Sequence, residues 1–151
     1  MKNETSIKIL QYYATNLAAQ SNAHKVQGKV FAAQGFSALG SKYAEHATEE
    51  MGNVDKFIDR IIDLGGEAKV EASPEFPVFK DVLDFLKADL QISKTGIEEL
   101  RKHIDSVQQD YTTFDMLKEY LKDEEEDMYW TEQQLELIDK IGLQNWLIKQ
   151  I

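Results

Sequence analysis

The chain has 151 residues, no cysteine and a formal net charge of -10 at pH 7. This length fits a single domain, and the lack of cysteine excludes disulfides, thiolate metal sites and cysteine nucleophiles. The acidic balance argues against a nucleic-acid partner, and the absence of a long apolar run argues against a membrane partner, so we expect a cytoplasmic protein.

Four long helices and one short helix are predicted, because glycine and proline are sparse and fall between long uninterrupted segments. The long helices cover about residues 5–34, 37–64, 78–104 and 113–141. Thr112 and Asp115 have the spacing of a capping box at the start of the fourth helix. A short amphipathic helix is predicted over 143–151, after the stop that Gly142 provides.

The connections between these helices predict the topology. The connection after residue 34 is short, so the first two helices should be antiparallel neighbours. The link 65–77 contains both prolines. When extended it reaches ~43 Å, about the length of a helix of about 28 residues, so the second and third helices can run parallel. The sequence therefore predicts an all-α fold, a four-helix bundle with one long crossover and a short fifth helix.

A polar residue interrupts the apolar seam of each long helix near its middle. The seams follow alternating steps of three and four residues, and the interruptions are Ser21 with His24, Glu50, Ser93 and Glu124. Because the middles of four aligned helices lie at one level of a bundle, we expect these side chains to converge. Buried carboxylates beside a histidine suit iron, zinc or manganese. A hydrogen-bond network that fixes helix register is the alternative.

Three further polar residues lie one turn from these interruptions and extend the candidate site. Asn53 follows Glu50 by three residues and Asp127 follows Glu124 by three, while Asp89 precedes the third-helix interruption by four. The neighbouring acids Glu125 and Glu126 are interpreted as part of a solvated face.

Two segments resemble the bacterioferritins. Residues 49–66, EEMGNVDKFIDRIIDLGG, are similar to the second helix of that family, which carries Glu-Met-x-His followed by Ala-Asp and an Arg-Ile run. Residues 121–151 are similar to its fourth helix and tail, where Asp-Glu-Glu-x-His precedes a Trp and a Gly-Leu-Gln-Asn ending. The resemblance covers nearly all of residues 1–151 and implies a single ferritin-like domain with one long crossover.

The resemblance also implies a function. Subunits of this family pair about two-fold axes, assemble into a hollow homo-oligomeric shell, oxidise ferrous iron at a di-iron centre inside each bundle and store the ferric mineral. A shell of about 24 subunits is favoured over one of about 12. The sequence departs from the family at the di-iron ligands, since two of six are kept: Glu50 and Glu124, with Leu17, Asn53, Ser93 and Asp127 at the other positions.

These replacements leave two interpretations of the site. Ferroxidase activity is implied by the resemblance, whereas most of its ligands are replaced. A rearranged set would suit a single divalent ion, iron or another metal, and its candidate residues are Glu50, Glu124, Asp127, His24 and Asn53.

Met51 stands where the resemblance implies a haem ligand shared between two subunits, and a core or interface methionine is the alternative. Glu45, His46 and Glu49 are expected on the cavity side of the second helix.

Two other functions remain open. One is a Dps-type mini-ferritin that shields DNA, suggested by the Leu-Gly-Gly ending at 64–66. The other is a non-catalytic ferritin-like scaffold subunit.

Overall fold

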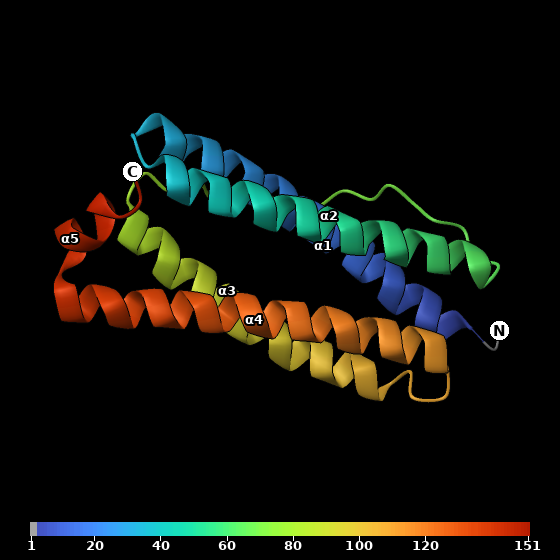
Figure 1. Ribbon diagram of the computed structural model, residues 1–151. Helices are drawn as coiled ribbons and strands as arrows, with labels where there is room; N and C mark the ends of the chain where they lie inside the picture. The colour runs from blue at the N-terminus through green and yellow to red at the C-terminus, as the bar shows by residue number, and fades with distance from the viewer. Residues whose placement is uncertain (1–2) are drawn as a thin grey trace.

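The computed structural model describes residues 3–151, and every regular element in that range is a helix. Four long helices form two hairpins that pack into a bundle, and a short helix closes one end (Figure 1). Their bounds are α1 Glu4–Ala33, α2 Ser37–Asp63, α3 Val82–Asp105, α4 Tyr111–Ile141 and α5 Leu143–Ile148. The predicted all-α bundle is confirmed.

The long connection between α2 and α3 returns along the length of the bundle (Figure 1). This path makes α2 and α3 parallel, as the reach of the link predicted, while α1 with α2 and α3 with α4 are antiparallel pairs. Within residues 3–151, no helix combines the length and the apolar character needed to cross a membrane.

The third helix begins at Val82, so its predicted start at residue 78 is wrong. Gln27 of α1 holds the preceding segment outside the helix: its Nε2 donates to the carbonyl oxygen of Phe79 at 2.6 Å, and its Oε1 accepts from the Phe79 amide at 2.9 Å. Asp81 then caps the helix by accepting from the amide of Asp84 at 2.9 Å.

Two other predicted boundaries also differ. The fourth helix is capped by Asp110, whose side chain accepts from the Thr113 amide at 3.3 Å, so the capping box predicted at Thr112 is wrong. Arg60 donates to the same Asp110 carboxylate at 2.7 Å and fixes the cap against α2. The short helix α5 ends at Ile148, three residues before the predicted end.

The core consists of two apolar clusters, one toward each end of the bundle. The first cluster includes Leu10, Phe57 and Leu117, and the second includes Phe31 and Trp146. The Trp146 indole of α5 is fully buried and donates to Gln134 of α4 at 2.9 Å, which fixes the closing helix. Along α1, α2 and α4, most of the buried polar side chains lie between the two clusters, and the exceptions are Ser6 and Thr113 near the helix starts.

Two glycines let α1 and α2 approach closely. A Cβ atom added at Gly28 would lie 2.8 Å from the carbonyl oxygen of Gly40, and one added at Gly40 would lie 2.8 Å from that of Gly28. Contacts this short with backbone atoms leave no room for a side chain. The α1–α2 hairpin therefore depends on glycine at this crossing.

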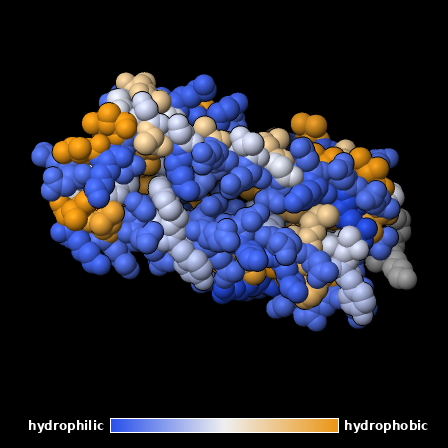
Figure 2. Space-filling view, in the orientation of Figure 1, coloured by the Kyte–Doolittle hydropathy of each residue, from blue (hydrophilic) through white to orange (hydrophobic). Residues whose placement is uncertain are grey.

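The middle of the face formed by α2 and α4 is mostly hydrophilic, and apolar side chains gather at both ends of the molecule, including the α5 end (Figure 2). Glu45 and Glu49 of α2 are exposed. The expectation for His46 is wrong, because its side chain turns into the bundle and is 4% exposed.

Candidate functional site

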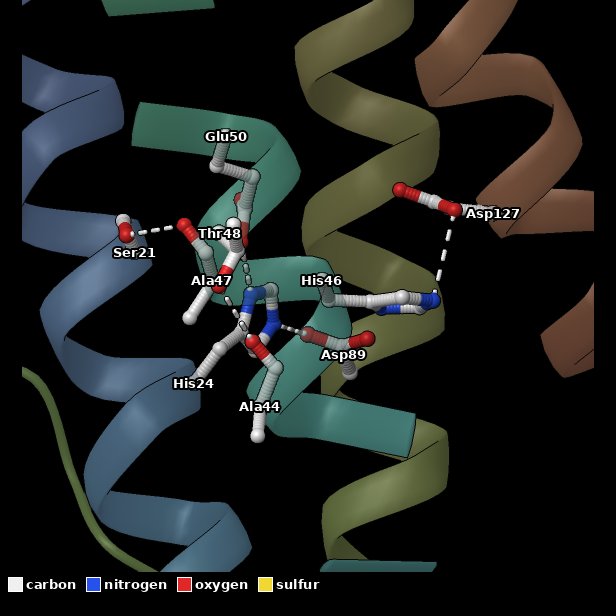
Figure 3. Close-up of polar contacts among 9 residues, drawn as sticks. All are labelled: Ser21, His24, Ala44, His46, Ala47, Thr48, Glu50, Asp89 and Asp127. Atoms are coloured by element: carbon white, nitrogen blue, oxygen red, sulfur yellow. Dashed lines mark hydrogen bonds and ion pairs between the residues drawn. The ribbon is translucent and has the colours of Figure 1, made fainter. Parts of the chain in front are cut away.

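The centre of the bundle contains a chain of three charged side chains from three helices. His24 of α1 is 5% exposed and lies between two carboxylates. Its Nδ1 is 2.6 Å from Oε1 of Glu50 on α2, and its Nε2 is 2.9 Å from Oδ1 of Asp89 on α3 (Figure 3). The sequence placed His24 and Glu50 together, and the structure brings them into direct contact.

With both carboxylates ionised, this geometry requires a proton on each ring nitrogen of His24. Ionised carboxylates only accept hydrogen bonds, so a ring that bonds to one on each side must donate twice. Burial opposes the charge of His24, yet the hydrogen bonds to Asp89 and Glu50 hold the pKa of the imidazole well above its ordinary value. Burial raises the pKa of Glu50, against the opposing effect of its hydrogen bond with His24. The short bond between them is typical of a charge-assisted pair.

The second buried histidine faces α4. Nε2 of His46 lies 3.4 Å from Oδ1 of Asp127 (Figure 3), which is within ion-pair range but does not form a hydrogen bond. Burial, reinforced by the positive charges of His24 and Lys42, lowers the pKa of His46 to about 4. His46 is therefore neutral at pH 7. Burial and the charge of Glu50 raise the pKa of Asp127 to about 7.

Glu124 of α4 is 9% exposed and faces the same interior. Burial and the nearby charges of Glu50 and Asp127 raise its pKa to about 8, so the carboxyl is mainly protonated at pH 7. A cavity of about 350 Å³ between α1, α3 and α4 is lined by this carboxyl together with Leu17 and Ser93. Leu17, Ser93 and Glu124 stand at three of the six di-iron ligand positions implied by the resemblance, and all three line this cavity.

The remaining predicted residues have other partners or positions. Asn53 donates to Asp123 of α4 at 3.2 Å, away from His24. Ser93 lines the cavity, and Asp89, one turn earlier, reaches His24 in its place. Ser21 donates to the carbonyl oxygen of Ala47 at 2.7 Å, which ties α1 to α2 (Figure 3).

Met51 lies on the outside of the α1–α2 hairpin. Its side chain is 41% exposed and lines a groove of about 730 Å³ with residues of both helices, including Ser21 and Lys25. The core interpretation of Met51 is therefore wrong. A ligand or subunit contact at this surface remains a prediction.

The sequence predicted His46 on the cavity side of its helix and did not predict the direct contact of Asp89 with His24, although the spacing of His46 contained a signal for burial. His46 lies three residues after Tyr43 and four before Glu50, so it shares their helix face. Ala47, the next residue, satisfies the same alternation of three and four and is apolar, so the sequence pattern favours it over His46 as the core-facing residue. Asp89 was placed only as a neighbour of Ser93.

The side chains do not fit a di-iron centre. Leu17 offers no ligand atom, Asn53 is bonded to Asp123, and both nitrogens of His24 donate protons, so neither has a lone pair for a metal. Across residues 3–151, no group of three or more His, Asp or Glu side chains is arranged to hold a metal ion. The arrangement is instead suited to neutralising buried carboxylates with an imidazolium.

Comparison with known proteins agrees with the helical topology. The family model described as a ferritin-like domain matches residues 7–141. A bacterial ferritin of Neisseria meningitidis serogroup B is 32% identical over 152 residues, covering 99% of this chain and 98% of that protein. A bacterial ferritin of Pseudomonas aeruginosa is 32% identical over 148 residues, with 96% of each chain covered. A bacterioferritin of Brucella melitensis is 32% identical over 111 residues, covering 72% and 68%. The chain therefore belongs to the ferritin family.

Proposed function

We propose that this protein is a subunit of a hollow iron-storage shell whose intra-subunit metal site is degenerate. Membership of the ferritin family and relatives named bacterial ferritin and bacterioferritin support iron as the stored cargo. The double contact of His24 with Glu50 and Asp89 is the observation that supports a degenerate metal site. An imidazolium there supplies the positive charge that metal ions would otherwise supply to buried carboxylates.

The shell is proposed to be a homo-oligomer of two-fold dimers, of about 24 subunits. Its net charge of -10 per chain favours the attraction of ferrous ions, and the exposed Glu45 and Glu49 add negative charge to one face of α2. Oxidation to the ferric mineral would then occur slowly by dissolved oxygen at the mineral, or at a partner subunit with an intact centre. The lack of cysteine supports a reducing, cytoplasmic setting.

A rearranged single-metal site is the second candidate. The charge of Glu50 helps to raise the pKa of both Glu124 and Asp127, which favours cation binding among these acids. To join this set as a ligand, His24 would have to lose a proton and its contact with Asp89. Asn53 would likewise have to leave Asp123.

Aerobic oxidation of ferrous iron separates these candidates. The wild type and a Glu50→Gln/Glu124→Gln variant should oxidise iron at equal rates, close to that of buffer, while both shells retain the iron that is oxidised. A faster wild-type rate that the double variant loses would overturn the degenerate site in favour of the rearranged one. A shell that retains no iron would support the scaffold function instead.

Two further measurements test the assembly and the haem proposal. The mass of the shell distinguishes about 24 subunits from about 12, the smaller number being expected of a Dps-type mini-ferritin. A haem bound through Met51 would give a Soret absorption band after expression with ample haem, and a Met51→Leu variant would lose that band. A wild-type protein without the band would remove the haem proposal.

A further inference from the structure

Two neighbouring side chains of α2 have a polar atom that is buried without a hydrogen bond. Among residues 3–151, Oη of Tyr43 and Nε2 of His46 are the buried side-chain atoms in this state. Their rings are 5.4 Å apart. Leaving a polar atom buried and unpaired costs about 1–3 kcal/mol, so two such atoms at one place indicate a bound group that would satisfy them.

The distance between His46 and Asp127 indicates the size of that group. Nε2 of His46 and Oδ1 of Asp127 are 3.4 Å apart, longer than the roughly 2.7–3.2 Å of a hydrogen bond. Two ligands of one tetrahedral metal ion, each bound at about 2.0–2.2 Å, lie roughly 3.3–3.6 Å apart. The pair therefore has the spacing of adjacent ligands around an ion.

The charges around this pair favour a cation over a water molecule. Asp127 lines a cleft between α2 and α4 together with three further acids, Glu49, Asp123 and Glu126. The nearby cation, His24, is already bonded on both sides. An added positive charge would be stabilised here, because the four acids that line the cleft outnumber the one cation among its described lining residues, Lys56.

A route from solvent reaches Asp127, the outer member of the pair. A cleft of about 350 Å³ between α2 and α4 is lined by Asp127 together with Glu49, Asp123 and Glu126. Waters in this cleft could complete the coordination of an ion held by two protein ligands.

We propose that Nε2 of His46 and the carboxylate of Asp127 bind one divalent transition-metal ion per subunit, with the Tyr43 hydroxyl donating to an ion-bound water. A neutral imidazole and a carboxylate together suit Zn²⁺, Co²⁺ or Fe²⁺. The site shares one position, Asp127, with the set implied by the resemblance. It does not depend on iron storage, because it requires neither oxidation nor a mineral.

Cobalt binding to the assembled protein tests this site. After treatment with a chelator, wild-type protein is dialysed against Co²⁺, and bound cobalt is counted per subunit while its visible absorption is recorded. We expect one ion per subunit with the bands of a nitrogen- and oxygen-bound ion. His46→Gln and Asp127→Asn should each weaken binding by at least roughly tenfold.

His103→Gln is the matched control, because it replaces the third histidine at a different place, where the ring contacts Tyr13. This variant should bind cobalt as the wild type does. Equal cobalt binding by wild type and His46→Gln, or no binding by the wild type, would overturn the proposal. If His46→Gln does not fold, Asp127→Asn gives the same test, since the Asp127 side chain is partly exposed. Failure here would leave the iron-oxidation result unaffected.

Discussion

Replacing His24 with glutamine should destabilise the protein strongly. Glutamine retains hydrogen-bonding capacity but has no charge, so Glu50 and Asp89 would remain buried without their cation. Each charge-assisted hydrogen bond contributes about 1.5–3 kcal/mol, and removing one partner of a buried ion pair costs about 3–5 kcal/mol. Because two such bonds are lost together, we expect a cost of about 3–5 kcal/mol, measured as a lower thermal unfolding midpoint at fixed protein concentration.

The cost should depend on pH in one direction. The contacts hold the pKa of His24 above its ordinary value of 6.5, so the stability it contributes is complete below that value and is lost as pH rises through the folded-state pKa. The difference between wild type and His24→Gln should therefore be largest near about pH 6 and smaller at alkaline pH.

A compensated variant separates charge from packing. His24→Gln/Glu50→Gln/Asp89→Asn removes the cation together with both anions, so it should be more stable than His24→Gln alone. A His24→Gln cost below about 1 kcal/mol, or a triple variant no more stable than the single one, would refute the ion-triad reasoning.

The raised pKa of Glu124, about 8, makes the folded state bind this proton more tightly than the unfolded state, so wild-type stability should fall as pH rises from about 5 to 9. Glu124→Gln should make this fall smaller, as measured by thermal unfolding midpoints across the pH range. Gly28→Ala should cost about 1–3 kcal/mol in thermal unfolding, since its Cβ would meet the Gly40 backbone. Gln27→Ala removes both bonds to Phe79, costs about 1–3 kcal/mol and should speed proteolysis of residues 64–81.

Each of these variants has a matched control. Glu126→Gln changes an exposed acid on the same helix and should keep the wild-type pH slope. Gly52→Ala changes a helical glycine with open space around it and should not destabilise. Gln34→Ala removes one exposed bond, to the carbonyl oxygen of Lys80, and should leave proteolysis nearly unchanged. A variant that behaves like its control would contradict the corresponding argument.

The order and direction of the helices could be predicted because they depend on local features and on chain length. Sparse glycine and proline marked the connections, and the reach of the link between the second and third helices gave the crossover. The start of α3 could not be predicted in this way, because it depends on Gln27, which lies 52 residues before Phe79 in the sequence. At the start of α3, the local sequence favours helix, whereas the hydrogen bonds from Gln27 keep Phe79 out of the helix.

The sequence predicted which helix turns form the candidate site, but not which side chains within those turns contact one another. The interrupted seams located His24 and Glu50 correctly in one interior layer. On α3, a difference of one turn separates Ser93 from Asp89, and only the packed helices decide which residue reaches His24. On α2, His46 and Ala47 both fit the apolar alternation.

The family resemblance identified the positions at which metal ligands were expected. It did not predict that the positive charge of His24 would stand in place of the metal ions. Leu17, Asn53 and Ser93 could be recognised as departures from the pattern in the sequence. That both nitrogens of His24 are bonded to carboxylates follows only from interatomic distances. The proton on that ring is therefore a structural inference that the sequence alone does not contain.

The protonation of His24 is the most direct test of the account, and solid-state ¹⁵N NMR of shells labelled at histidine can measure it. The chain has three histidines, and His24→Gln identifies the signals of this one. At about pH 7.5 an ordinary histidine is mostly neutral, whereas we predict protons on both ring nitrogens of His24. A neutral ring with one deprotonated nitrogen would contradict the account, because that lone pair would be free to bind a metal.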